Sequence, residues 1–306
     1  MNAPLQTAPE QTGGTGARVL VLVVGGGTMG RGIAGLCALA GYETLVYEAD
    51  AAARERVLPS ICGSWERAVA SGRLDAEKVR DATERLRTVH SLEEGRSATY
   101  AVEAVYESLE LKERIFGELD RLCPDARLLG SNTSSLSIGS IARSTSRPDR
   151  VIGVHFFNPV PVMPLIEIVY GPETSEATIA AAEAFAATLA KKTVRVRDAP
   201  GFATSRLGVA LGLEAMRMVE EGIASAGDID RAMELGYGHR MGPLKTTDLV
   251  GLDVRLSIAE ALAEGLDPVR FAPPKILRDL VAKGRLGKKS GRGFYRWEGD
   301  EAKEDG

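Results

Sequence analysis

An apolar run that ends in three consecutive glycines constrains the fold of this chain more than any other feature. The run Val19–Val24 leads into the segment GGGTMG, in which the first, third and sixth residues are glycine. Glycines at this spacing allow a tight turn, the close approach of a pyrophosphate, and tight packing of a helix on a strand. The amides at the start of the following helix then face the phosphates. The pattern predicts cofactor contacts at Gly25, Gly27, Thr28, Met29 and Gly30.

A second strand and an acidic residue follow the glycines in the order that dinucleotide binding requires. The pattern predicts a helix that reaches about Ala40 and a strand over residues 42–48, which together form a βαβ unit. Glu48 ends this strand, where a carboxylate accepts hydrogen bonds from the adenosine ribose and repels a 2′-phosphate. The alternatives are a glycine turn that only changes direction and a solvated glutamate, with Arg54 nearby as the one residue that argues for a 2′-phosphate. We therefore expect NAD rather than NADP.

The rest of the chain falls into two parts of different character. Apolar strand-like runs occur at 98–105, 126–134, 150–157, 163–171 and 191–201, with helical segments such as Lys112–Leu122 between them. This rhythm predicts an α/β, Rossmann-type domain over residues 17–200, with a mainly parallel sheet covered by helices on both faces. Pro200 and Gly201 then interrupt the pattern, and the segments beyond them have helical spacing without a convincing strand. We expect an all-α second domain over residues 201–306.

Composition excludes several other classes of protein. The 306 residues carry a net charge of −4 with both signs interspersed, and no apolar run is long enough to cross a bilayer. The three cysteines stand far apart without a CxxC pair, which fits small buried residues in a reducing cytosol better than disulfides or a zinc site. Residues 1–16 lack the apolar region of a signal peptide and are predicted to be a disordered leader. We expect a cytoplasmic protein that binds no metal, nucleic acid or membrane.

One histidine stands where a catalytic base is expected. Of the chain's histidines, His90 lies in a charged segment and His239 in a turn, whereas His155 ends a strand. The carboxyl ends of strands are the ligand-binding edge of an open α/β sheet. Glu167, twelve residues later, alternates onto the same face as apolar neighbours, so it is expected to be buried and to need a partner. The pair predicts a carboxylate-assisted base, and the alternative is a core histidine satisfied by a backbone carbonyl.

The loop SNTSSLSI, residues 131–138, places hydroxyls and an amide at the end of another strand. Ser134 and Asn132 could there hydrogen-bond a ligand. The alternative is that Ser134 or Ser135 caps the next helix.

Together these residues resemble the L-3-hydroxyacyl-CoA dehydrogenase family, and its short 3-hydroxybutyryl-CoA dehydrogenases in particular. The resemblance runs from about residue 18 to residue 297 and rests on GGGTMGRGIA, VEAVYESLELK, SNTSSL, GVHFFNPVPVMPLIEIV, DAPGF, MGPLKTTDLVGLD and GRLGKKSGRGFY. It implies an NAD-dependent conversion between L-3-hydroxyacyl-CoA and 3-ketoacyl-CoA, in a homodimer joined through the helical domain. It also implies the roles of individual residues. The catalytic pair is His155 and Glu167, a substrate-contacting serine is Ser134, and the cofactor-binding residues include Glu48, Glu107, Lys112, Asn132 and Asn158.

One position departs from the family pattern. The family has asparagine in PGFxxNR, where this chain has Ser205. We expect Ser205 to contact the substrate, and the alternative is a helix cap. This departure keeps two other functions open. One is oxidation of a free or acyl-carrier-bound hydroxy acid, such as a sugar acid. The other is an NAD-binding protein that no longer catalyses.

Overall fold

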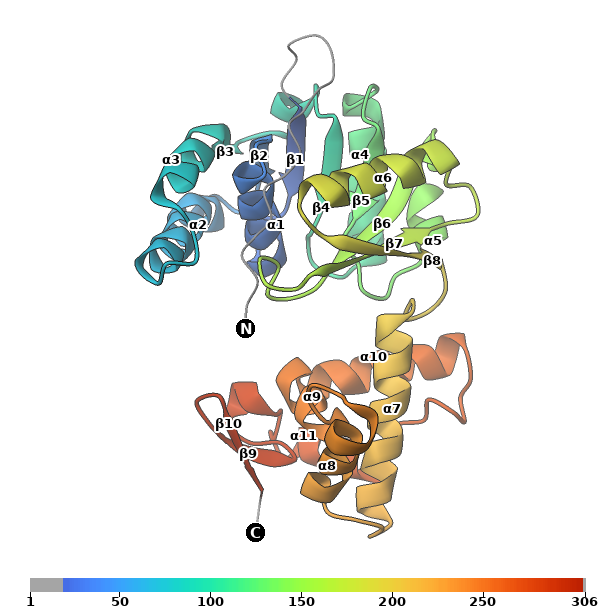
Figure 1. Cartoon of the computed structure of the whole chain (residues 1–306). Coiled ribbons are helices and arrows are strands. Elements are labelled where there is room, and N and C mark those ends of the chain that lie inside the picture. Colours follow the sequence, from blue (N-terminus) through green and yellow to red (C-terminus); the bar gives the residue numbers. More distant parts are fainter. Residues whose placement is uncertain (1–18, 305–306) are drawn as a thin grey trace. The chain divides into compact units, whose positions relative to one another are not determined.

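The computed structural model of the chain describes residues 19–304, so the predicted leader lies outside the described residues. The chain divides into two compact units, Met1–Asp198 and Ala199–Gly306. In Figure 1 the colours follow the sequence, so the first unit runs from blue to yellow and the second from yellow to red.

An eight-stranded sheet forms the centre of the first unit, as Figure 1 shows. Its strand order is β3-β2-β1-β4-β5-β6-β7-β8, and every neighbouring pair is parallel except β6 and β7. The predicted Rossmann-type, mainly parallel fold is confirmed. The strand bounds are β1 Leu20–Val24, β2 Glu43–Tyr47, β3 Leu86–Val89, β4 Tyr100–Glu103, β5 Leu128–Ser131, β6 Val151–Phe156, β7 Leu165–Tyr170 and β8 Lys192–Arg197.

Strand β3 is the one strand of this sheet that the sequence pattern does not predict. It has only four residues, and the polar pair Arg87 and Thr88 occupies its middle. Such a short run has neither the alternation nor the apolar length that indicates a strand. Pairing with β2 at the edge of the sheet is what makes it extended.

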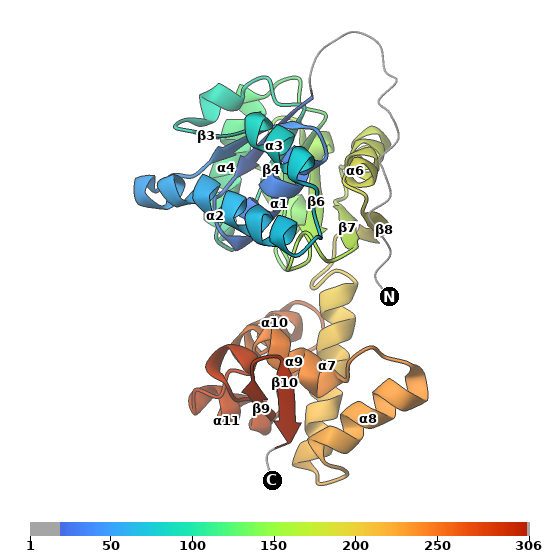
Figure 2. The ribbon, with the colours of Figure 1, turned by 60° about the vertical axis from the view of Figure 1, so that its left-hand side comes forward.

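Helices cover both faces of the sheet, as Figures 1 and 2 show. On one face Val21 and Val23 of β1 belong to a core with side chains of α1, α2, α3 and α6. On the other face lie α4, α5 and the short 3-10 helix η1, where Gly95 approaches Leu22. The bounds are α1 Thr28–Leu39, α2 Ala51–Ala70, α3 Ala76–Arg85, η1 Leu92–Gly95, α4 Leu109–Leu122, α5 Ile138–Ala142, η2 Pro148–Arg150 and α6 Glu176–Thr188.

The antiparallel pair β6 and β7 has a simple cause. Only residues 157–164 connect the two strands, and a parallel crossover needs a dozen or more residues. The chain therefore turns back on itself as a hairpin. The hairpin register places His155 directly opposite Glu167.

The second unit is mainly helical, with its own core of side chains such as Leu213, Leu244 and Phe271. The expectation that it holds no strand is wrong, because β9 and β10 form a hairpin. Tyr295 and Trp297 alternate inward on β9, and the two residues Gly299 and Asp300 make the turn, which is a usual hairpin signal. The bounds are α7 Thr204–Glu220, α8 Ala226–Tyr237, α9 Pro243–Val250, α10 Leu252–Gly265, α11 Lys275–Ala282, η3 Lys288–Ser290, β9 Tyr295–Glu298 and β10 Glu301–Glu304.

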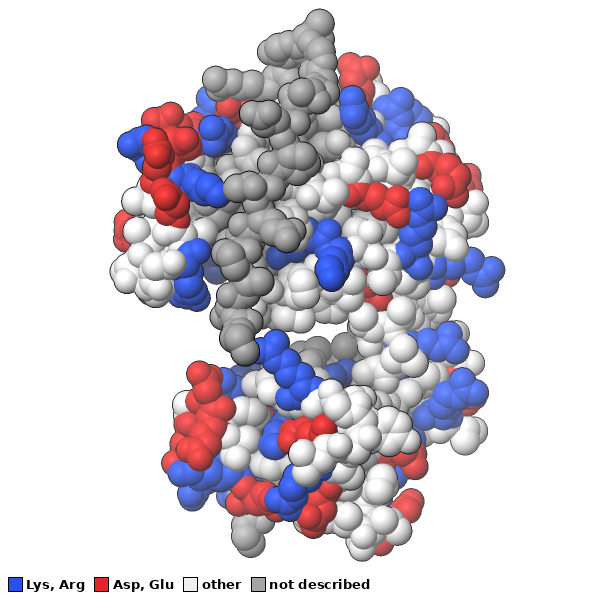
Figure 3. Space-filling model, viewed as in Figure 1, with Lys and Arg blue, Asp and Glu red and all other residues white. Residues whose placement is uncertain are grey.

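The distribution of surface charge and the burial of the cysteines can be compared with what the composition predicts. On the face shown in Figure 3, acidic and basic side chains are interspersed rather than gathered by sign. Cys37 and Cys123 are buried, as the sequence predicts for small apolar residues, whereas Cys62 is only half-buried; all three are free. None of the helices within residues 19–304 combines the length and the apolar character that a membrane crossing needs.

Candidate active site

The glycine turn has the shape that a pyrophosphate needs. A Cβ atom on Gly25 would stand 2.6 Å from the carbonyl oxygen of Ala104, and one on Gly30 would stand 1.9 Å from that of Gly25. Packing therefore requires these two glycines. A Cβ on Gly27 would meet nothing within 4 Å, so Gly27 borders open space. Because no side chain caps α1 at Gly27, the amides of its first turn are available to a phosphate.

Glu48 lies beside this turn, as the ribose-binding role requires. Its Oε2 accepts a hydrogen bond from the amide of Gly26 at 2.8 Å, and its Oε1 accepts one from Asp50 at 3.0 Å. Each carboxylate oxygen has a second lone pair for a ribose hydroxyl. Arg54, the one nearby residue that could favour a 2′-phosphate, donates a hydrogen bond to the backbone oxygen of Glu48 at 2.7 Å. Its guanidinium is therefore already engaged.

His155 and Glu167 are paired as the sequence predicts. His155 Nδ1 lies 2.8 Å from Glu167 Oε2, with His155 7% exposed and Glu167 fully buried. An ionised carboxylate only accepts hydrogen bonds, so Nδ1 carries the hydrogen atom and Nε2 is the proton-accepting nitrogen. The ring of Phe157 packs at 4.6 Å from the imidazole, measured between centroids. The geometry is that of an oriented base whose charged form a buried carboxylate stabilises.

Glu107 organises the loop that carries Ser134. Its Oε1 accepts hydrogen bonds from Thr133 Oγ1 at 2.6 Å, from the amide of Ser134 at 3.1 Å and from Ser135 Oγ at 3.0 Å. Burial opposes ionisation of Glu107, but Lys112 and these hydrogen bonds together hold its pKa below the ordinary value. The alternative that Ser134 or Ser135 caps α5 is wrong, because the cap is Ser137.

A buried ion pair, which the sequence interpretation missed, lies under this loop. Lys112 Nζ is 2.6 Å from Glu103 Oε1 and 3.3 Å from Glu107 Oε2, and Lys112 and Glu103 are only 1% and 0% exposed. Glu103 also accepts from Ser131 Oγ at 2.7 Å. A glutamate that ends the apolar run of β4 was the available signal, since a buried carboxylate needs a partner. Glu103 links the ends of β4 and β5 to the start of α4.

Two asparagines lie at the carboxyl ends of β5 and β6. Asn132 Oδ1 accepts from the amide of Phe156 at 2.9 Å, which joins the ends of these strands and leaves the amide NH₂ as a donor. Asn158 is exposed in the loop of residues 157–164. Lys191 Nζ holds this loop through the carbonyl oxygens of Val160 and Met163, both at 2.7 Å. This tether was not predicted.

Ser205 belongs to the second unit. It lies in the first turn of α7, whose N-cap is Ala203. The alternative that Ser205 is the helix cap is therefore wrong. The structure brings the other predicted residues together along one edge of the sheet, because most of them lie at or just after the carboxyl ends of β1, β2, β4, β5 and β6. Glu167 joins them from antiparallel β7, where it lies opposite His155.

The comparison with known families matches this architecture. The model for the NAD-binding domain of 3-hydroxyacyl-CoA dehydrogenase matches residues 20–199, and that for its C-terminal domain matches residues 201–297. The chain belongs to the 3-hydroxyacyl-CoA dehydrogenase family. The predicted family, the oxidoreductase activity on 3-hydroxyacyl-CoA and NAD as the cofactor are thereby confirmed.

Three relatives of this dehydrogenase are similar over nearly their full length. A probable 3-hydroxybutyryl-CoA dehydrogenase of Bacillus subtilis is 42% identical over 278 residues, which cover 91% of this chain and 97% of the relative. The 3-hydroxybutyryl-CoA dehydrogenase of Mycobacterium tuberculosis is 46% identical over 283 residues, or 90% and 97%. The crystal structure of M. tuberculosis FadB2 superposes with a TM-score of 0.86 at 44% identity, covering 91% of this chain and 98% of that one.

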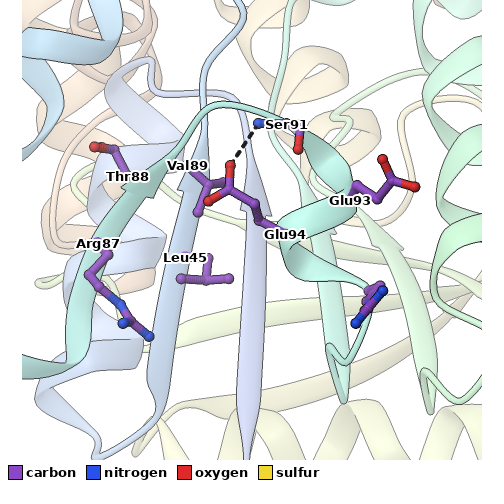
Figure 4. Close-up of a pocket in the computed structure, with 8 residues that line it drawn as sticks. Leu45, Arg87, Thr88, Val89, Ser91, Glu93 and Glu94 are labelled. Atoms are coloured by element: carbon purple, nitrogen blue, oxygen red, sulfur yellow. Dashed lines mark hydrogen bonds between the residues drawn. The ribbon is translucent and has the colours of Figure 1, made fainter.

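The dehydrogenase also has a cavity apart from the predicted site. The cavity has a volume of about 600 Å³ and lies beside β2, β3 and η1. Glu94 points toward the amide of Ser91 in Figure 4 and accepts its hydrogen bond at 3.1 Å. No predicted site residue lines this cavity. Within residues 19–304 no group of three or more histidine, cysteine, aspartate or glutamate side chains could hold a metal ion.

Proposed function

We propose that this dehydrogenase interconverts L-3-hydroxybutyryl-CoA, or a similar short-chain L-3-hydroxyacyl-CoA, and the 3-ketoacyl-CoA. The observation that carries the proposal is the contact of 2.8 Å between His155 and the buried Glu167 at the ligand-binding edge of the sheet. The names of the relatives from B. subtilis and M. tuberculosis support the short acyl chain.

In the oxidative direction His155 Nε2 takes the proton from the C3 hydroxyl. Glu167 stabilises the imidazolium that results, and general base catalysis of this kind contributes a factor of about 10² to 10⁴ in rate. Bound NAD supplies the acceptor for the hydride from C3. Ser134 orients the reacting oxygen, on a loop that Glu107 holds in place.

The cofactor is held by residues at the carboxyl ends of the first strands. Gly25, Gly27, Thr28, Met29 and Gly30 surround the pyrophosphate, and Glu48 binds the adenosine ribose. On the nicotinamide side, the binding groups are Glu107, Lys112 and Asn158, and Asn132 also binds the cofactor. The open space at Gly27 and the amide contacts of Glu48 support these roles.

Ser205 contacts the substrate from the first turn of α7, with a hydroxyl in place of the family's amide donor. A shorter side chain at this position leaves room for a bridging water or a different acyl group.

The active form is a homodimer in the cytoplasm. Large apolar side chains are exposed on the second unit, and covering such a surface favours association. They include Leu207, Leu211, Leu235, Tyr237 and Val250. Three free cysteines fit a reducing compartment.

The test is His155→Asn, assayed by oxidation of NADH with acetoacetyl-CoA. We expect kcat to fall by at least about 10²-fold, while NADH binding, followed by fluorescence titration, stays within twofold. His90→Asn, the same change at an exposed histidine, is the control and should keep full activity. Retention of more than about a tenth of kcat would refute His155 as the base. Turnover of free acetoacetate in place of the thioester would show that the substrate is a free hydroxy acid.

A further inference from the structure

The second unit contains a buried cation without a partner among the described residues. Arg255, in α10, is 7% exposed, and its Nε has no hydrogen-bond partner. The neighbouring carboxylate of Asp253 is paired instead with Lys289 Nζ, at 2.6 Å. Burial lowers the pKa of the guanidinium to about 10. Burying a charge without a counter-ion is costly, so the arrangement indicates that an acceptor is supplied from elsewhere.

The guanidinium lies against the helix that begins at the proposed substrate contact. Its Nη1 stands 3.3 Å from the position that a Cβ atom on Gly208 would have. Ser205 and Gly208 are three residues apart in α7, so they share one face of the helix. The guanidinium beside Gly208 therefore lies next to the face of α7 that carries Ser205.

A second unsatisfied group extends the same face. Gly212 lies one turn beyond Gly208, and a Cβ on it would stand 3.0 Å from Thr247 Oγ1. Thr247 is fully buried, and this hydroxyl has no hydrogen-bond partner among the described residues. Along this face of α7 lie, in order, Ser205, the guanidinium of Arg255 from α10 and the hydroxyl of Thr247 from α9. Because Gly208 and Gly212 have no side chains, Arg255 and Thr247 can pack directly against α7.

The chemistry of these groups selects the ligand. A guanidinium offers planar paired donors that match a carboxylate. Ser205 and Gly208 are separated by about one helical turn, ~5 Å, which is the reach of a few methylene groups.

We propose that Arg255 binds a carboxylate at the far end of the acyl chain, so that the preferred substrate is a 3-hydroxyacyl thioester of a dicarboxylic acid. This rests on the proposed function, in which Ser205 contacts the substrate. Arg255 is then a specificity-determining residue rather than a catalytic one.

The test compares two thioesters of equal chain length, 3-ketohexanoyl-CoA and 3-ketoadipyl-CoA, by the rate of NADH oxidation. In the wild type we expect kcat/KM to be at least tenfold higher for the carboxylate-ended chain, a difference of about 1.4 kcal/mol. Arg255→Met should reduce this ratio to about one. Arg255→Lys should give an intermediate ratio, because lysine keeps the charge but not the planar pair of donors. Arg231→Met, which removes an exposed arginine from the same unit, is the control and should leave the ratio unchanged.

Melting temperature and sedimentation velocity, measured on the same variants, separate the other roles of Arg255. A ratio near or below one in the wild type, or an unchanged ratio in Arg255→Met, would overturn the proposal. A change in oligomeric state with an unchanged ratio would assign the acceptor to a second copy of the chain and would also overturn it. Failure of both thioesters while acetoacetyl-CoA still reacts would also overturn the proposal, whereas failure of all three in the wild type would refute the proposed function.

Discussion

Replacing Lys112 with methionine should destabilise the first unit strongly. Lys112 is buried with Glu103, and the two charges are 2.6 Å apart. Methionine has a similar volume, so the packing cost is small, below about 1.5 kcal/mol. The substitution nevertheless leaves the Glu103 carboxylate in the interior without its cation. Breaking a buried pair in this way typically costs about 3–5 kcal/mol of the free energy of unfolding.

Removing the stranded charge should restore part of the loss. In Lys112→Met/Glu103→Gln, the amide oxygen can accept from the amide of Val105, which donates to Glu103 Oε1 at 2.6 Å. The amide NH₂ can donate to Ser131 Oγ, because a hydroxyl both donates and accepts. The double variant should therefore be more stable than Lys112→Met alone, by about 2 kcal/mol, roughly half of the cost of the broken pair.

Urea unfolding followed by circular dichroism measures these differences. The control is Lys78→Met, the same change at an exposed position of α3, which should alter the free energy by no more than about 0.5 kcal/mol. A loss below about 1 kcal/mol for Lys112→Met, or a double variant less stable than the single one, would refute the reasoning from a buried charge pair.

Three further predictions concern single side chains. Glu167→Gln should lower kcat by roughly 10- to 10³-fold, because an amide does not stabilise imidazolium as a carboxylate does, and an unchanged pH–rate profile would contradict the pairing with His155. Ala190→Gly should raise the free energy of unfolding, measured by calorimetry, by about 0.5–1 kcal/mol, because Ala190 follows α6 with φ +55°, a conformation that costs alanine more than glycine. A lower melting temperature in this variant would contradict the prediction. The lowered pKa of Glu107 means that its ionised form stabilises the fold at neutral pH and that this contribution disappears as the pH falls through that pKa. On acidification from neutral pH to about pH 3, below the ordinary glutamate pKa of about 4.3, the free energy of unfolding should therefore fall less in Glu107→Gln than in the wild type. An equal fall in both proteins would show that ionised Glu107 does not stabilise the fold.

Features that depend on neighbours in the chain could be predicted from the sequence. The turn at Gly25–Gly30 depends on the absence of side chains at fixed spacing, and the elements around it follow from apolar periodicity. Glu48 follows the second strand of the same unit, so its position beside the turn is also local in origin. The pairing of His155 with Glu167 could be anticipated because both belong to a single hairpin.

Contacts between distant segments could not be predicted in the same way. Lys191 reaches the loop after β6, and Arg255 lies against Gly208 of another helix. Edge strand β3 is extended only because β2 pairs with it. In each case the sequence shows the chemical group but not the partner, since the partner depends on which segments pack together.

The sequence by itself therefore determined the glycine turn, the acid beside it, and the pairing of His155 with Glu167. Only the tertiary structure decided that Glu103 neutralises Lys112 and that Arg255 is buried without a counter-ion from residues 19–304. The physical reason is that backbone conformation and alternation are set over a few residues. The cost or gain of burying a charge, in contrast, depends on every group that the fold brings within a few ångströms of it.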